Sequence, residues 1–221
     1  MGYIIVTARS VVWMLLNLVC NLMALYAILS PSWISAAPQL ATFNNHTVKY
    51  TPSLGLYSKC SRPIWWDEHV CTAMDSVGPF AKSPMYPGPW KATSVFLTLG
   101  LFLLSITGSS SIVSCCQQSV FKKSIFIVSG AAQCVAGIFL ILAMMLYPMA
   151  WGTRTVRELC GKDSSPFYLG DCALGPGLYM GAGSTALTFV CSYLSMPAEK
   201  STSSDKVQNK IYEGQTLICL S

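Results

Sequence analysis

Four long apolar segments, separated by polar ones, dominate the hydropathy pattern of the chain. Each is close to the about 20 residues that a helix needs to cross about 30 Å of hydrocarbon. None contains an Asp, Glu, Lys, Arg or His. We therefore predict four transmembrane helices, and their expected ranges are residues 11–30, 92–115, 125–148 and 174–196.

The polar segments between these spans set the expected topology. With both termini in the cytoplasm, residues 1–10, 116–124 and 197–221 lie inside, and two loops, 31–91 and 149–173, lie outside. A cleaved signal peptide is the alternative for the first span, but the apolar run exceeds the usual core of about 7 to 15 residues. The count of Lys and Arg favours the opposite orientation, although a long folded loop is largely exempt from that rule. Orientation therefore rests on the chemistry of the two loops.

Alternating β-forming residues predict a small sheet in the first loop. Residues 47–51 alternate, and residues 56–61 continue in the same manner after Pro52 and Ser53. Such runs, separated by turn residues, are typical of antiparallel strands. The proline-rich end of the loop, 84–90, is expected to be irregular. The expected fold class is an all-α membrane four-helix bundle with a small extracellular antiparallel β-sheet.

Cysteines and a sequon place the two loops in an oxidising compartment. Of the ten cysteines, four lie in the loops: Cys60, Cys71, Cys160 and Cys172. We predict two disulfides, pairing the first two and the last two, with free thiols as the alternative. Asn45 begins the sequence Asn-His-Thr, an N-glycosylation acceptor that requires a loop in the secretory lumen.

The remaining candidate residues belong to the spans and their inner ends. Cys115 and Cys116, beside two lysines, predict palmitoylation at a cytoplasmic face, with unmodified thiols as the alternative. Gly177, Gly181 and Thr185 form a small-residue stripe that predicts close helix packing within the chain or, as the alternative, in a homodimer. Asn17 and Asn21 share one helix face and should turn into the bundle. For the tail, a helix from Asp205 onward and a disordered segment are the two alternative predictions.

Composition argues against several function classes. Hydrophobic residues make up 52% of the 221 residues and charged ones 10%, against about 25% charged in soluble domains. The net charge of +5 is spread over all loops, so no nucleic-acid partner is expected. Cys60, His69 and Cys71 could be read as metal ligands, but a disulfide explains the cysteines better. No catalytic motif is found, and neither a cofactor nor a metal is expected.

Several separated motifs resemble those of known tetraspan proteins. Trp33, the run Gly55-Leu56-Tyr57, and the pair Cys60 and Cys71 resemble the pattern of the claudin-like superfamily, in which the third aromatic is usually Trp. A closer resemblance is to the LHFP-like (lipoma HMGIC fusion partner-like) tetraspan family. Its marks are the run 147–152, Cys160-Gly161, Gly170-Asp171-Cys172 and two tail segments, 203–208 and 217–220. The tail segments are most similar to subfamily 2.

This resemblance implies a function without catalysis. Some members of the family act as auxiliary subunits that bind and organise channels, receptors or adhesion proteins. We therefore expect a multi-pass protein of the plasma membrane whose partners are the lipid bilayer and another integral membrane protein. A claudin-like adhesion or paracellular barrier protein is the alternative, and a channel is a third hypothesis.

Overall fold

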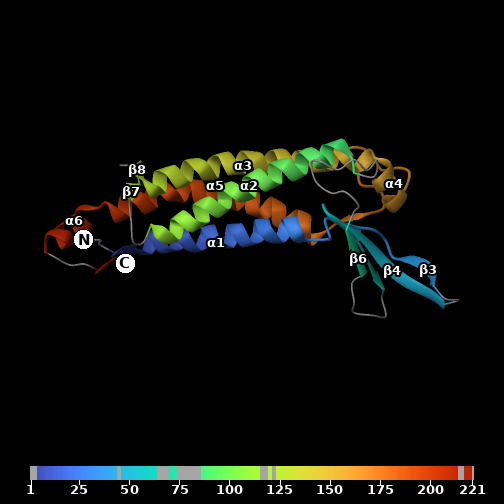
Figure 1. The fold of residues 1–221 in the computed structure, drawn as a ribbon, viewed down its shortest axis with the longest axis horizontal. Helices are drawn as coiled ribbons and strands as arrows, with labels where there is room; N and C mark the ends of the chain where they lie inside the picture. Colours follow the sequence, from blue (N-terminus) through green and yellow to red (C-terminus); the bar gives the residue numbers. More distant parts are fainter. Residues whose placement is uncertain are drawn as a thin grey trace. The chain divides into compact units, whose positions relative to one another are not determined.

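A computed structural model describes residues 4–43, 46–63, 70–73, 86–114, 119–120, 123–213 and 217–220. Long helices dominate these residues, as Figure 1 shows. The long helices are α1 (Ala8–Leu29), α2 (Gly88–Val113), α3 (Ile125–Met149) and α5 (Pro176–Thr202). Among the described residues, the first three have the length and composition of membrane spans. Helix α5 is as long, but its many Gly, Ser and Thr residues lower its hydropathy.

Two proline-containing helix ends differ from the sequence prediction. Helix α2 begins at Gly88, inside the stretch that we expected to be irregular, because Pro89 falls in the first turn, where a missing N–H costs little. Helix α5 continues through Pro197 to Thr202, so the helix itself does not end where the tail was expected to begin. The points at which the bilayer begins and ends along each helix stay predictions.

The chain folds as two compact units, and each long helix contributes residues to both. We call them the terminal unit and the sheet unit. The terminal unit comprises Met1–Met23, Leu99–Phe139 and Ser184–Ser221, and the sheet unit comprises Ala24–Thr98 and Leu140–Gly183.

The terminal unit has the inside-out polarity of helices that lipid surrounds. Leu22 is 57% exposed, whereas Asn17 is 1% exposed and Gln133 is fully buried. In water, this arrangement would expose apolar surface and bury polar groups at a cost. In a bilayer it is favourable, because the exposed leucine contacts acyl chains and the buried amides bind one another.

Both chain ends take part in a small folded structure of the terminal unit. Strand β1 (Ile4–Thr7) pairs in parallel with β10 (Leu217–Leu220), and helix α6 (Asp205–Tyr212) packs beside them. Ile5, Val207 and Ile218 form the buried cluster, with Ile211 at its border. The apolar face of the tail helix is therefore covered by the chain's own strands. A short hairpin, β7 (Ser119–Val120) with β8 (Lys123–Ser124), precedes α3.

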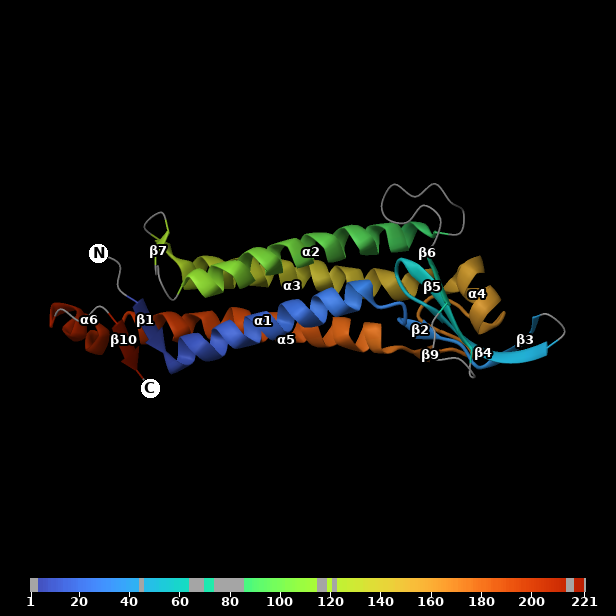
Figure 2. The same cartoon turned by 60° about the horizontal axis from the view of Figure 1, so that its bottom comes forward.

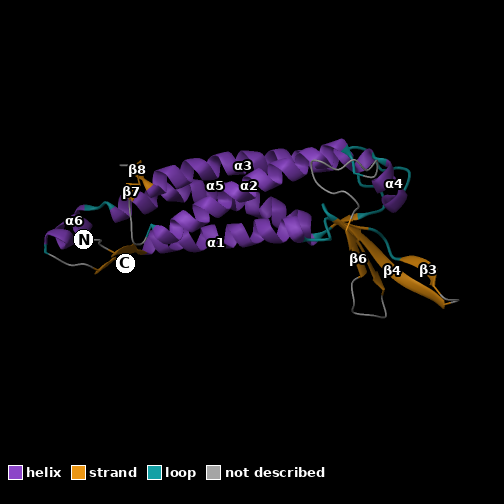
Figure 3. Cartoon of the chain, viewed as in Figure 1, coloured by secondary structure: helices purple, strands orange, loops and turns teal. Residues whose placement is uncertain are grey.

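The sheet unit contains a six-stranded antiparallel sheet, drawn in orange in Figure 3. Its strand order is β6-β5-β4-β2-β9, and β3 also pairs with β4. The strands are β2 (Ile34–Ser35), β3 (Gln39–Phe43), β4 (His46–Leu54), β5 (Ser58–Pro63), β6 (Val70–Ala73) and β9 (Ala173–Leu174). A 3-10 turn, η1 (Ala150–Gly152), and helix α4 (Arg154–Cys160) follow α3. The predicted antiparallel pairing of the two strands in the first loop is confirmed by β4 and β5.

Candidate interaction site on the sheet unit

Both predicted cysteine pairs are disulfides in the structure. Cys60 and Cys71 lie opposite each other on the paired strands β5 and β6. Cys160, the last residue of α4, is joined to Cys172, which lies just before β9. Each bond closes a short loop, with 11 and 12 residues of sequence separation. Neither pair of thiols is therefore available to a metal or a reactive group.

Three of the four residues of the Trp and Gly-Leu-Tyr pattern fasten the sheet to the helix ends. Trp33 is fully buried and donates its indole N–H to the carbonyl of Ala27 at 2.6 Å. Its backbone N–H bonds the carbonyl of Leu54 at 3.1 Å, and Leu56 is also fully buried. A Cβ on Gly55 would lie 2.5 Å from the carbonyl oxygen of Ser30, so only glycine allows this approach. These three positions therefore hold the sheet against the helix ends.

Tyr57, the fourth residue of the pattern, is half-buried and bonds the side chain of Thr98. Burial raises the pKa of the Tyr57 hydroxyl above its ordinary value, and the hydrogen bond to Thr98 offsets part of that rise. The sequence difference at this position, Tyr for the more usual Trp, therefore places a hydroxyl group between the sheet and α2.

An aromatic stack continues from Trp33 through the buried part of the sheet unit. The ring of Tyr147 lies 4.6 Å from that of Trp33 and stacks on Trp90 at 5.5 Å with an angle of 10° between planes. Trp90 donates its indole N–H to the carbonyl of Tyr147 at 3.4 Å. Trp151 meets Tyr147 edge-on at 6.4 Å. Aromatic pairs in stacked or edge-to-face arrangements contribute about 0.5 to 1.5 kcal/mol each beyond burial.

The small-residue stripe on α5 packs against residues of the chain itself. A Cβ on Gly177 would lie 2.7 Å from Cδ1 of Trp33, and one on Gly181 would lie 2.6 Å from Cε of Met144. Thr185, in the terminal unit, is 7% exposed. These contacts favour the internal-packing interpretation, and they leave the homodimer without an assigned surface.

The terminal unit contains a buried polar network that sequence reasoning found only in part. The amide of Gln133 donates to Oδ1 of Asn17, and the amide of Asn21 donates to the carbonyl of Asn17 at 3.0 Å. The thiol of Cys20 lies 3.0 Å from the hydroxyl of Thr188. A Cβ on Gly108 of α2 would lie 2.8 Å from Nδ2 of Asn21, so both asparagines face the bundle as predicted, but Gln133 was not singled out. Gln133 could have been found as a polar amide in the middle of the apolar span 125–148, because polar residues within a span usually face the bundle interior.

Three predicted modification sites lie outside the described residues. These are Asn45, Cys115 and Cys116. Glycosylation of the first and palmitoylation of the other two stay predictions. Among the residues that are described, no group of three or more His, Cys, Asp or Glu side chains could hold a metal ion.

The hairpin of β3 and β4 extends from the sheet and carries an exposed apolar side chain. Figure 2 shows the two strands extending side by side from the rest of the sheet. Tyr50 pairs with both Gln39 of β3 and Pro63 of β5, whereas the preceding residues of β4 pair with β3 among the described strands. Leu40, on the outer strand, is 74% exposed. An apolar side chain on an open strand edge is typical of a surface that binds another chain.

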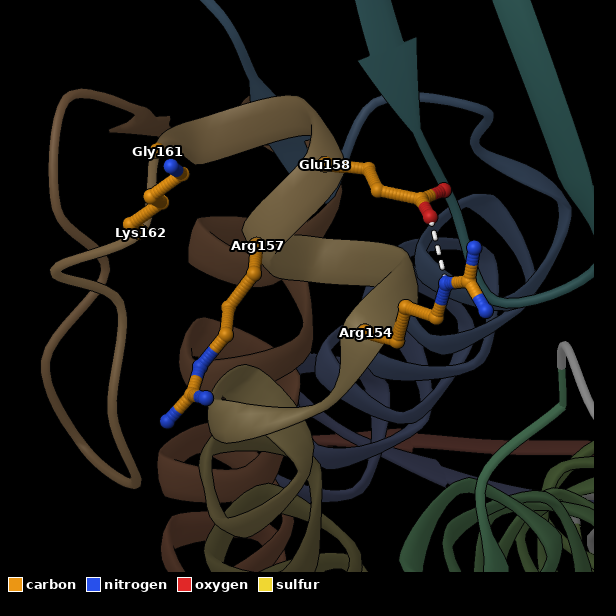
Figure 4. A pocket seen from close by; sticks show the side chains of 5 residues that line it. All are labelled: Arg154, Arg157, Glu158, Gly161 and Lys162. Atoms are coloured by element: carbon orange, nitrogen blue, oxygen red, sulfur yellow. Dashed lines mark hydrogen bonds and ion pairs between the residues drawn. The ribbon is translucent and has the colours of Figure 1, made fainter.

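Helix α4 carries a second exposed surface with mixed charge. Arg154, Arg157, Glu158, Gly161 and Lys162 line an open hollow of about 470 Å³, shown in Figure 4. Arg154 donates to Glu158 at 2.7 Å, and their side chains are 92% and 62% exposed. A pair as exposed as this contributes little to stability. Arg157 points away from that pair and donates from Nε to the carbonyl of Ser164 at 3.0 Å.

Comparisons with a family model and with individual proteins point to the same family. Residues 9–197 match the family described as lipoma HMGIC fusion partner-like protein. The chain is 40% identical over 229 residues to LHFPL tetraspan subfamily member 2a protein of Danio rerio and 39% identical over 233 residues to subfamily member 2 protein of Homo sapiens. In both cases the match covers 100% of each chain. LHFPL tetraspan subfamily member 4 protein of Bos taurus is 29% identical over 39% of this chain and 34% of its own length.

Proposed function

The chain belongs to the lipoma HMGIC fusion partner-like tetraspan family, and from this premise we propose a non-enzymatic accessory protein of the plasma membrane. It crosses the bilayer four times, with both termini in the cytoplasm, and binds another integral membrane protein through the sheet unit. The chemistry of the described residues is consistent with this role, since they offer surfaces for recognition rather than a cluster of reactive groups.

The fourth span is α5. Its first 21 residues, 176–196, contain no charged side chain. A helix of this length can cross the hydrocarbon. Its low hydropathy reflects small and hydroxyl residues that are buried, such as Ser184, Thr188 and Ser195. The hydroxyl of Thr188 donates to the carbonyl of Ser184, and that of Ser195 donates to the carbonyl of Ser192, so bonds to the helix backbone satisfy part of this polar content.

The extracellular position of the sheet and of the segment 149–173 is supported by the two disulfides, since such bonds persist in oxidising compartments. Protease applied to intact cells should cut the sheet unit and spare the tail. Cleavage of the tail from outside would contradict this topology.

The observation that carries the partner-binding proposal is the β3–β4 hairpin. Leu40 is 74% exposed on a strand edge, while the sheet behind it is fixed by a disulfide between neighbouring strands and by the buried Trp33. A rigid base reduces the entropy lost on binding. The exposed Lys49 on β4 adds charge beside the apolar contact. Together these residues offer a strand edge and an apolar anchor to the extracellular part of a membrane protein.

Co-purification in mild detergent tests the proposal. We expect wild-type protein to recover one predominant membrane protein, and Leu40→Lys to recover about tenfold less, which corresponds to about 1.4 kcal/mol of binding free energy. Tyr212→Lys is the matched control, since Tyr212 is 85% exposed in the terminal unit, and it should retain the partner. Equal recovery with both variants would overturn the assignment of the hairpin. Raised transepithelial resistance without a partner would favour a barrier protein instead.

A further inference from the structure

A tight turn in the loop between α4 and β9 displays two aromatic side chains. Ser165 and Tyr168 exchange backbone hydrogen bonds of 3.0 and 2.9 Å, with Pro166 second and Phe167 third in the turn. Phe167 has a φ of 64°, the one positive φ of a non-glycine residue in the described part of the chain. A type II turn has these features and normally requires glycine at the third position. A bulky aromatic residue there is strained, so the turn keeps Phe167 at the expense of stability.

The turn is fixed at the end of helix α3. The backbone N–H of Phe167 donates to the carbonyl of Pro148 at 3.1 Å. A Cβ on Gly152 would lie 2.8 Å from Cδ of Pro166, so the turn packs closely on η1. Ser164 is 1% exposed and donates its hydroxyl to the carbonyl of Leu169 at 3.2 Å. The aromatic residues are therefore held within one hydrogen bond of the last residues of an apolar span.

The two rings face outward although their neighbours are buried. Phe167 and Tyr168 are 59% and 60% exposed, whereas Val156 and Leu169 are 0% and 8% exposed. Arg157 lies beside the turn, because its Nε donates to the carbonyl of Ser164 at its start. A guanidinium has five N–H donors in a fixed fork, so a single bond from Nε leaves others for an anion. A strained turn thus presents two aromatic rings and a cation together.

We propose that residues 165–168 are a membrane anchor, with Phe167 and Tyr168 at the boundary of headgroups and acyl chains and Arg157 on a lipid phosphate. Aromatic side chains concentrate at that depth of a bilayer, where an apolar ring and a polar end are both satisfied. The bond to Pro148 places the turn at that depth, since the predicted span of α3 ends at this residue. The anchor needs α3 to cross the membrane and its span to end near Pro148, and it does not rest on the partner-binding role of the β3–β4 hairpin.

The ligand is the phospholipid headgroup in general rather than an acidic lipid. The segment 153–174 contains three basic residues, Arg154, Arg157 and Lys162, and three acidic ones, Glu158, Asp163 and Asp171. This neutral balance gives no long-range attraction to negative membranes. A zwitterionic headgroup, with a phosphate within reach of Arg157, fits the arrangement.

Photo-crosslinking in membranes of intact cells tests the anchor. We replace Phe167 with p-benzoylphenylalanine, which keeps an aromatic ring at the turn, and measure adducts by mass spectrometry of the purified full chain. Phospholipid adducts should predominate. The same probe at Leu40, which is 74% exposed on the hairpin, is the matched control and should give few lipid adducts. Should the probe at position 167 prevent folding, the same probe at Tyr168 reads the same depth.

A second comparison isolates Arg157. With the probe at position 167, Arg157→Gln should lower the yield of lipid adducts by about fivefold, the size expected when one hydrogen bond to a phosphate is lost. Arg154→Gln should leave the yield unchanged, because Arg154 is paired with Glu158. Adducts to a protein, or a lipid yield no greater than at Leu40, would overturn the anchor. Loss of the co-purified partner by Leu40→Lys bears only on the hairpin, so the two proposals fail separately.

Discussion

Different interactions stabilise each of the two units of this chain. The sheet unit has two disulfides, backbone pairing between strands and a stack of buried aromatic rings. The terminal unit has side-chain hydrogen bonds among amides, hydroxyls and a thiol, with small apolar clusters such as Trp13, Phe126 and Ala198. Each set suits its solvent. A small sheet in water buries too little apolar area to be stable alone, whereas helices in lipid associate through packing and polar contacts.

The largest effect is expected from removing the disulfide that joins strands β5 and β6 of the sheet. The double variant Cys60→Ser, Cys71→Ser should lower the free energy of unfolding of the sheet unit by about 2 to 3 kcal/mol, because the unfolded chain regains the freedom of a short loop. Thermal unfolding in detergent and delivery to the cell surface are the measurements. Cys134→Ser is the control, since Cys134 is an exposed free cysteine of α3. The two single variants should impair delivery equally, and a difference between them would contradict the pairing.

A second test adds one methyl group where the sheet unit is most closely packed. Gly55→Ala places a Cβ 2.5 Å from the backbone oxygen of Ser30 and 2.8 Å from Cα of Pro31. Because backbone atoms cannot turn aside, we expect a loss of about 1 to 3 kcal/mol in thermal unfolding. Gly88→Ala is the matched control, since nothing lies within 4 Å of a Cβ there. Equal stability of the two variants would show that the sheet does not depend on this contact.

Much of the helical fold could be predicted from the sequence because each long helix contains a run of about 20 residues without a charged side chain. The strands β4 and β5 also followed from their alternation, and Cys60 and Cys71 from their position in a polar loop. Strands β2 and β9 could not be found, since two residues show no periodicity and their pairing is non-local. The pairing of β1 with β10 was missed for the same reason, because partners at opposite ends of the chain have no local signal.

The candidate surfaces were less predictable than the fold. The pattern residues Trp33, Gly55 and Leu56 carry the resemblance to the claudin-like superfamily, yet all three are buried. Leu40 and Phe167, on which the proposals rest, occur in stretches with no known motif. Exposure and a positive φ are properties of the folded backbone. They become visible only when the neighbours of a residue are known.

A third test concerns the polar side of the comparison, in the terminal unit. Gln133→Leu should lower the free energy of unfolding by about 1 kcal/mol, because Oδ1 of the buried Asn17 loses its donor. Adding Asn17→Leu should recover part of the loss, since both polar partners are then absent. A double-mutant cycle by thermal unfolding in detergent gives the coupling energy. Coupling near zero would mean that this amide pair does not hold the helices.

The smallest expected effect concerns Tyr57, where the sheet meets α2. Burial raises its pKa above the ordinary value of about 10, so the folded state holds the phenolic proton more tightly than the unfolded chain does. The resulting stability is fully present below about pH 10 and is lost as the pH rises through the folded-state pKa. Tyr57→Phe should therefore lower stability by about 0.5 to 1 kcal/mol at neutral pH, through loss of the hydrogen bond to Thr98. It should also lessen the decline in thermal stability at alkaline pH, whereas Tyr212→Phe, at an 85% exposed site, should leave that decline unchanged. If thermal stability falls with rising pH in parallel for wild type and Tyr57→Phe, the hydroxyl is as well solvated in the folded unit as in the unfolded chain. The sheet unit would then depend on its disulfides and its aromatic stack instead.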